Sequence, residues 1–161
     1  MDEAIFPLTS YFTRGWYKIG SRPTRKYIWN PYQKTCAFAA LGFRKHYTKL
    51  NRRINSNSYM SFLKRIRKHH KKLCIIGDNA PWHGPENVQR SSTRVREYIK
   101  DNGIIFLQIP PYSPELDPVE IYWRNVKKWI GTKTYSSLPE LKALLRAAFI
   151  KQSLLIDISD Y

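Results

Sequence analysis

The chain has 161 residues, of which 42% are apolar, and its 28 Lys and Arg residues outnumber 12 Asp and Glu residues. This length and apolar content suffice for one hydrophobic core, so we expect a single globular domain over residues 1–161. The net charge of +16 favours a polyanionic partner, with nucleic acid ahead of an anionic membrane surface. Because the sequence shows neither an apolar run of ~18 residues nor a secretory leader, we expect a cytoplasmic protein without a membrane partner.

Acidic residues are distributed unevenly along the chain. Between Glu3 and Asp78 there is no Asp or Glu, whereas the same stretch holds 17 of the 28 basic residues. A carboxylate site that draws on both halves of the chain can therefore take only Asp2 or Glu3 from the first half.

The predicted elements begin with a strand at residues 1–6, which leads into a connection interrupted by Gly and Pro. The aromatic side chains of this connection are expected to pack on the sheet, and stacking on nucleobases is the alternative: Tyr11, Phe12, Trp16 and Tyr17. Residues 34–43 predict a buried strand, and residues 46–54 predict its more polar, basic neighbour.

A helix is predicted over residues 59–70, with N-caps available at residues 56–58. One face carries an apolar stripe and the other carries four cations: Lys64, Arg65, Arg67 and Lys68. The sequence offers them no acidic partners within the helix, so they are either a solvated face or phosphate contacts. We assign these four residues, with Arg52 and Arg53 just before the helix, as candidate DNA contacts.

The second half of the chain alternates strands and helices. Residues 73–77 form a short apolar run typical of a central strand covered on both faces. Beyond it we predict a helix at 84–100, a strand at 104–109, and helices at 118–130 and 138–152. Three strands followed by alternating units indicate an α/β fold with a mixed sheet of about five strands and helices on both faces. Within this pattern, Cys36 and Cys74 are expected to be reduced, buried thiols.

Asp78 comes directly after the apolar run 73–77, at the strand end where open α/β sheets bind ligands. The sequence Asp-Asn-Ala-Pro that begins there is also favourable for an Asx turn, which needs no metal. From the residues alone, a ligand role and a turn role for Asp78 are equally favoured.

Glu120 lies in the first turn of the predicted helix 118–130. Asp117-Pro118-Val119-Glu120 fits a capping box in which Glu120 folds back to the cap amide, and this role is favoured by helix physics alone. However, Glu120 also lies at the margin of the apolar stripe, where it can face a cleft. Pro residues at 110, 111 and 114 stiffen the approach, as a two-metal site with ions ~4 Å apart would require.

Two motifs resemble those of a known family: Asp-Asn-Ala-Pro-Trp-His at 78–83 and Pro-Pro-Tyr-Ser-Pro-Glu-Leu-Asp-Pro-Val-Glu-x-x-Trp at 110–123. With Met1-Asp2-Glu3-Ala4 and the later Arg14-Gly15-Trp16 and Pro23, they are similar to the catalytic domain of mariner-like insertion-sequence transposases of the DDE superfamily. The resemblance covers nearly the whole chain, and we expect the helix-turn-helix region of that family to be lacking.

The resemblance implies a ribonuclease H-like fold and a metal-binding catalytic triad of Asp2, Asp78 and Glu120, with 75 and 41 residues between successive members. It implies two Mg²⁺ or Mn²⁺ ions, which would activate a water or a DNA 3′-hydroxyl and stabilise the leaving oxygen. The implied activity is DNA cleavage and strand transfer in transposition. The implied partners are transposon ends and target DNA, with a homodimer as the active complex and association with the nucleoid when DNA is bound.

Several neighbouring residues have two interpretations. Glu3 points to the opposite face of its strand from Asp2, so we expect a structural role for it. His83 could contact a phosphate or orient Asp78, whereas a cap or surface role is more usual; we include it with Arg124 and Lys127 among the candidate DNA contacts. Because only Met1 precedes Asp2, the alternative function is a catalytically inactive, decayed or repurposed transposase remnant that only binds nucleic acid.

Overall fold

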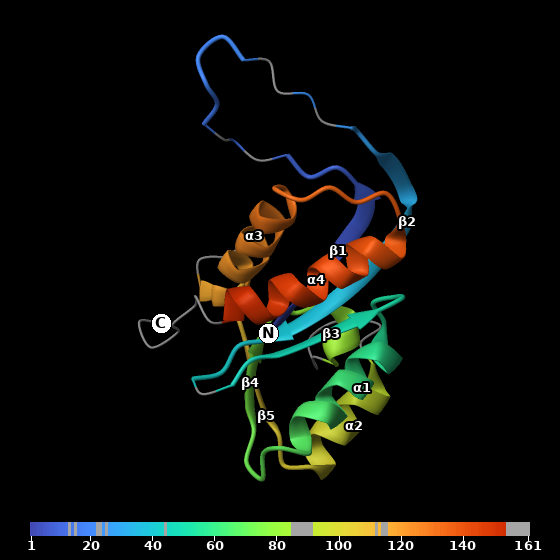
Figure 1. Cartoon of the computed structure of the whole chain (residues 1–161). Coiled ribbons are helices and arrows are strands. Elements are labelled where there is room, and N and C mark those ends of the chain that lie inside the picture. Colours follow the sequence, from blue (N-terminus) through green and yellow to red (C-terminus); the bar gives the residue numbers. More distant parts are fainter. Residues whose placement is uncertain are drawn as a thin grey trace.

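The computed structural model of the chain describes residues 1–12, 14, 16–21, 24, 26–43, 45–84, 92–111, 113 and 116–153. Its elements, in chain order, are β1 (Asp2–Thr9), β2 (Trp29–Ala40), β3 (Tyr47–Asn51), α1 (Ser56–Arg67), β4 (Cys74–Gly77), η1 (Pro81–His83), α2 (Thr93–Asp101), β5 (Ile105–Gln108), α3 (Pro118–Ile130) and α4 (Leu138–Ser153). Figure 1 shows α3 and α4 on one side of the β1–β3 sheet and α1 and α2 on the other. The predicted α/β class with helices on both faces is confirmed.

The first three strands form an antiparallel sheet with β2 in the middle. Asp2 pairs with Ala39 at one end of the β1–β2 ladder, and the register shifts between Pro7 and Leu8. Beyond this shift β1 continues to Thr9, past the predicted end at residue 6, and the side chain of Leu8 is buried in the core.

The prediction of one continuous five-stranded sheet is wrong for the described residues, because β4 and β5 pair in parallel as a separate two-stranded sheet. The two sheets nevertheless meet at the start of β1, where the amino group of Met1 donates a hydrogen bond of 2.6 Å to the carbonyl of Ile76. This contact brings residues 1–3 to the carboxyl end of β4.

The prediction that β4 is buried on both faces is also wrong. Ile75 and Gly77 face the interior, whereas Ile76 is 53% exposed and Cys74 is exposed as well. On β5, Ile105 and Leu107 are exposed. Both cysteines are free thiols as expected, but only Cys36 is buried.

Alternation along β2 divides the core into two clusters. Ala37 and Ala39 face the cluster built on α3 and α4, while Phe38 faces the cluster built on α1, α2 and β4. Met1 belongs to one cluster and Ala4 to the other, so Asp2 and Glu3 lie at the boundary between the two clusters.

The helix ends follow local capping chemistry. α1 begins at Ser56 because a capping box forms at its start. The amide of Ser58 donates to the side chain of Asn55, and the amide of Asn55 donates to the hydroxyl of Ser58. The predicted helix over 84–100 begins later, at Thr93, because Ser92 has extended backbone and caps the helix; residues 85–91 of that prediction lie outside the described residues. α3 has the predicted bounds. Within the described ranges, no helix combines the length and the apolar character that a membrane span needs.

Candidate active site

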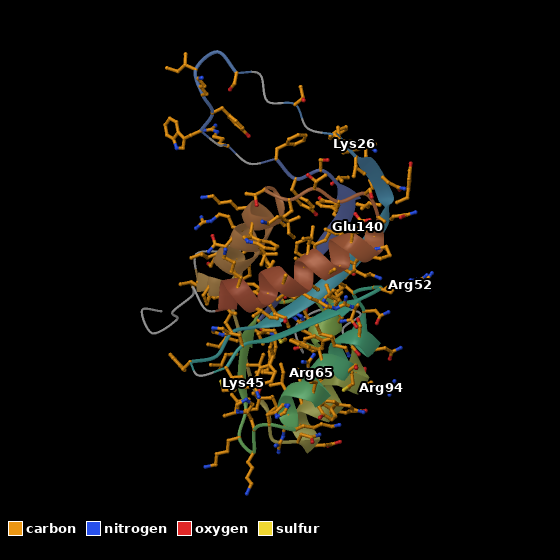
Figure 2. The ribbon with its side chains drawn as sticks, in the orientation of Figure 1. Lys26, Lys45, Arg52, Arg65, Arg94 and Glu140 are labelled. Atoms are coloured by element: carbon orange, nitrogen blue, oxygen red, sulfur yellow. The ribbon has the colours of Figure 1, made fainter. Side chains whose placement is uncertain are left out.

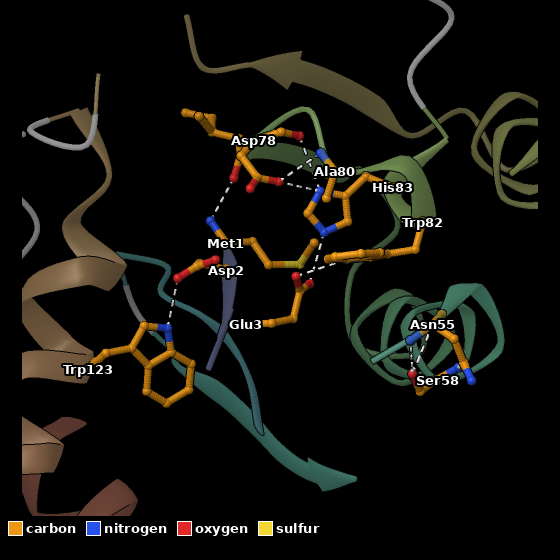
Figure 3. Close-up of polar contacts among 11 residues, drawn as sticks. Met1, Asp2, Glu3, Asn55, Ser58, Asp78, Ala80, Trp82, His83 and Trp123 are labelled. Carbon is orange, nitrogen blue, oxygen red and sulfur yellow. Dashed lines mark hydrogen bonds and ion pairs between the residues drawn. The ribbon is translucent and has the colours of Figure 1, made fainter. Parts of the chain in front are cut away.

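Strand β1 separates its first two carboxylates onto opposite faces. Asp2 points toward α3, where its Oδ2 accepts a hydrogen bond of 3.0 Å from Nε1 of Trp123. Glu3 points the other way, toward η1, and its side chain is 3% exposed. Figure 3 shows the two carboxylates diverging from the start of the strand. The alternation of a β-strand thus sends one acid to each core cluster.

Asp2 lies in a strongly acidic environment. Burial raises the pKa of its carboxyl to about 7, and repulsion from Glu3, Asp117 and Glu120 acts in the same direction. A hydrogen bond from the backbone at Glu3 opposes part of this rise. Asp117 is itself buried, where it caps α3 by accepting from the amide of Val119 at 3.0 Å. A cation placed among these carboxylates would relieve the repulsion between them.

Asp78 follows β4 and lies in an Asx turn, as one of the two sequence interpretations predicted. Its Oδ1 accepts from the amide of Ala80 at 3.1 Å, and Nδ1 of His83 lies 2.9 Å from the same oxygen. The hydrogen bond from His83 is the largest influence on Asp78 and holds the pKa of this carboxyl below its usual value. The side chain is 56% exposed, so an ionised carboxylate at the strand end faces solvent.

His83 connects the turn to β1. Its side chain is fully buried, and its Nε2 lies 2.8 Å from Oε1 of Glu3. Trp82 donates to the other oxygen of Glu3 at 2.9 Å, and the ring of Tyr59 packs against the imidazole at a tilt of 38°, with centroids 4.4 Å apart. Burial opposes protonation of His83, but its bonds to Asp78 and Glu3 outweigh this effect and raise its pKa to about 9. His83 is therefore an imidazolium between two carboxylates (Figure 3).

The burial of His83 removes it from the candidate DNA contacts, because an enclosed imidazole cannot reach a phosphate in this conformation. The other sequence interpretation, orientation of Asp78, agrees with the contacts. The structural role expected for Glu3 also agrees with its bonds to Trp82 and His83.

Glu120 is exposed in the first turn of α3. It lines a cavity of ≈ 370 Å³ with three cations and three aromatic residues: Arg124, Lys127, Lys128, Tyr11, Phe12 and Trp123. Among the described residues, the amide of Val119 donates to the side chain of Asp117, whereas the amide of Asp117 does not donate to the side chain of Glu120, so the predicted capping-box bond is not formed. The carboxylate of Glu120 is therefore available beside a cationic pocket.

The three acids of the predicted triad come from three elements: the start of β1, the end of β4 and the first turn of α3. In the part of the chain that the structure describes, no three His, Cys, Asp or Glu side chains lie close enough together to hold one metal ion. The donor type fits a hard divalent cation, because all three are carboxylates and the environment of Asp2 is acidic. Asp78, however, is held by His83 and the turn in the present conformation.

Three of the four cations predicted on α1 are exposed, namely Lys64, Arg65 and Lys68. Lys64 lies over the ring of Tyr98, 5.5 Å from its centroid, which directs it toward α2. Arg67 is half-buried and donates to the carbonyls of His70 and Asn102, so it ties α1 to neighbouring loops. Lys68, Arg52 and Arg53 are exposed. Arg67 is thus engaged in backbone contacts, and phosphate binding by the exposed cations of α1 stays a prediction.

Arg65 contributes to a basic groove, which we define by Lys49, Arg65 and Arg146. These residues line a cavity of ≈ 530 Å³ with His46, Thr48, Leu50, Phe149 and Ile150. Arg65 donates to the carbonyl of Thr48 at 3.1 Å, and Lys49 contacts the hydroxyl of Ser61 at 2.6 Å. Figure 2 shows Lys45, Arg65 and Arg52 distributed along the region of β3. Because Lys49 and Arg146 come from elements distant in sequence, the charge pattern alone did not single them out.

Comparison with known proteins gives the family and the fold of the chain. The sequence model of the family described as DDE superfamily endonuclease matches residues 1–142. The chain belongs to this family, which confirms the predicted superfamily. No curated protein matches the chain.

Solved structures with the same fold include complexes of Mos1 transposase. They are a paired-end complex with the left transposon end (TM-score 0.66, 17% identity), a strand transfer complex (0.67, 18%) and a pre-cleavage transpososome (0.67, 16%). Each alignment covers 92% of this chain and 45% or 46% of the Mos1 chain, so this chain spans less than half of that transposase. The fold is thus that of the matching part of Mos1 transposase.

Proposed function

We propose that the chain is a transposase catalytic domain that cleaves DNA phosphodiester bonds and transfers the resulting strands with the help of divalent metal ions. The observation that carries this proposal is the placement of Asp2 at the start of β1, where Trp123 holds its half-buried carboxylate at 3.0 Å and the Met1–Ile76 bond brings the strand to the end of β4, which Asp78 follows. Partial burial of the Asp2 carboxylate disfavours its ionised form, and a bound cation would offset this cost.

Asp2, Asp78 and Glu120 would hold Mg²⁺ or Mn²⁺. Two such ions, when bound, supply activation of the attacking oxygen and stabilisation of the leaving oxygen. The contribution of the chain itself is to position the carboxylates. Trp123 fixes Asp2, and His83 together with the amide of Ala80 fixes Asp78.

The DNA substrate is expected to reach Glu120 along α3. Arg124, Lys127 and Lys128 line the same cavity as Glu120 and can pair with backbone phosphates. By analogy with the Mos1 paired-end complex, which holds the left transposon end, and the Mos1 strand transfer complex, we propose transposon ends and target DNA as partners. Joining two ends calls for two active sites, so a homodimer is the proposed active complex.

The experiment is nicking of a plasmid that carries the transposon ends, with Mg²⁺ or Mn²⁺, by the wild-type chain and by Asp78→Asn. Asp101→Asn, at the exposed end of α2, is the matched control because it removes the same charge away from the site. We expect metal-dependent nicking by the wild type and the control, and none by Asp78→Asn. Equal nicking by all three proteins would contradict the proposed catalytic function.

A second candidate is a nucleic-acid-binding protein of the same family without turnover. It is favoured by one observation: within the described ranges the acids do not form a ready metal cluster. This candidate predicts DNA binding that weakens steeply with salt and does not respond to Mg²⁺. Metal-dependent cleavage by the isolated chain would exclude it.

A further inference from the structure

Two aromatic rings in the connection between β1 and β2 stack in a row with a third at the start of β2, outside the core. The ring centroids of Phe12 and Tyr27 are 5.7 Å apart with 16° between their planes, and those of Tyr27 and Trp29 are 6.3 Å apart with 18° between planes. All three side chains are exposed, by 74%, 55% and 67% respectively. We call these three residues the aromatic ladder. The prediction that the aromatics of this connection pack on the sheet holds for Tyr11, which contacts Phe6. It is wrong for Phe12, Trp16 and Tyr17, whose side chains are exposed.

The ladder begins at the candidate active site. Phe12 lines the cavity that also contains Glu120, Arg124, Lys127 and Lys128. Tyr27 and Trp29 continue the row away from that cavity, onto the start of β2. Figure 1 shows the connection leaving the body of the protein beside α3 and returning to β2. A row of flat, exposed apolar surfaces therefore extends outward from a carboxylate beside three cations.

We propose that the aromatic ladder binds unpaired nucleotides of a DNA strand whose backbone lies in the cavity beside Glu120. The three rings lie in nearly parallel planes, so the exposed faces at the two ends of the row can each stack on an unpaired base, and every base has a face that can stack. Cations beside an aromatic row supply the other half of a single-strand site, because they contact the phosphates. Bases in a continuous duplex are already stacked on one another, so the ladder selects nucleotides that are not paired.

The charge of the chain favours this occupant over a second copy of the protein. Residues 4–77 contain no acidic residue, so the ladder belongs to a cationic segment. The same segment of a second copy would bring like charge to it, whereas a nucleic acid brings opposite charge. The inference rests on the proposed function for the placement of the strand at Glu120.

The test is binding of a fluorescein-labelled oligothymidylate, followed by anisotropy in EDTA so that cleavage plays no part. We expect Phe12→Ala and Trp29→Ala each to weaken binding about tenfold, as the loss of one base–ring stack implies. Tyr27→Ala should weaken binding as well, because Tyr27 stacks on both end rings and keeps them in line. Tyr27→Phe keeps the ring and should bind as the wild type does. Tyr32→Ala is the matched control, since Tyr32 lies on the same strand, is 94% exposed and is not part of the ladder.

Binding of a blunt duplex of the same length should change less than twofold in the three ladder variants, and circular dichroism should show that they remain folded. The proposal is overturned if the ladder variants bind oligothymidylate like the wild type or if Tyr32→Ala weakens binding equally. It is also overturned if the ladder variants change only the mass measured by light scattering, because the rings would then form a protein interface. Absence of nicking by the wild type would defeat the proposed function, while this binding result, measured without metal, would stand on its own.

Discussion

The imidazole of His83 joins two carboxylates that belong to different sheets, Glu3 on β1 and Asp78 after β4. His83→Ala leaves the buried carboxylate of Glu3 with one donor fewer, so we expect the free energy of unfolding to fall by about 3 kcal/mol. Asp78 also loses its orienting donor, so the nicking rate should fall at least about tenfold, in the range known for residues that orient metal ligands.

The dissociation constant for DNA shows whether His83 orients Asp78 or contacts DNA itself. We expect this constant to be unchanged in His83→Ala, because the imidazole is fully buried. His83→Gln, whose amide can donate to Glu3, should recover part of the stability. His69→Ala provides the control, since His69 is exposed on the turn after α1. Wild-type stability and nicking in His83→Ala would contradict the positioning role.

The carboxyl of Asp2 gives stability a defined pH dependence. Its pKa is about 7 in the folded protein against 3.8 in the unfolded chain, so between these values the folded state binds the proton more tightly. Stability from this group is therefore greatest at low pH and decreases as pH rises through that window. Asp2→Asn removes the penalty, and we expect it to be more stable than the wild type by roughly 1–3 kcal/mol at pH above the folded pKa.

Urea unfolding of the wild type and Asp2→Asn on either side of this pH window measures the difference. The variant should gain stability above the folded pKa and lose this advantage below the unfolded value. Asp101→Asn, exposed at the end of α2, should show no such dependence. An equal difference between wild type and Asp2→Asn at both pH values would show that burial of the charge is not the cause.

At the scale of elements, the parts of the fold that could be predicted are those marked by residues close together in the sequence. α3 was predicted with its bounds because Asp117 and Pro118 mark its start and an apolar stripe runs along it. The burial of β4 was not predictable in the same way. A short apolar run is the same in sequence whether one face or both faces are covered, and here Ile76 is half-exposed.

In the candidate site, too, some features could be predicted from the sequence and others could not. Asp78 and Glu120 were located by motifs at the ends of elements, and Asp2 was selected by resemblance to a family. The pairing of Glu3 with His83 joins residues 80 positions apart, and that of Asp2 with Trp123 joins residues 121 apart. Alternation along β1 predicted that the two acids diverge, but the partner of each acid is set by tertiary packing, which sequence spacing does not specify.

At the scale of the whole molecule, the net charge of +16 raises the question of whether DNA binding is diffuse or localised. The basic groove favours localised binding because two of its cations are held in place by Thr48 and Ser61. The combined change of Lys49, Arg65 and Arg146 to Gln should lower the slope of log affinity against log salt by about 2–3, at about 0.9 per lost phosphate contact.

A matched triple variant removes the same charge elsewhere. Lys71, Lys72 and Lys100 are exposed and lie outside the basic groove, so their combined change to Gln should lower the slope by less than about 1. Duplex binding followed by anisotropy over a series of salt concentrations gives both slopes. Equal losses in the two triple variants would show that the charge acts diffusely.

The central claim is that Asp2, Asp78 and Glu120 act together as metal ligands although they come from three elements. Titration of Mn²⁺ into the protein with duplex DNA, followed by the paramagnetic resonance signal of free Mn²⁺, tests this claim most directly. We predict saturable binding of about two ions per chain, and loss of at least one ion in each of Asp2→Asn, Asp78→Asn and Glu120→Gln. Wild-type Mn²⁺ binding in the variant that combines all three substitutions would contradict it.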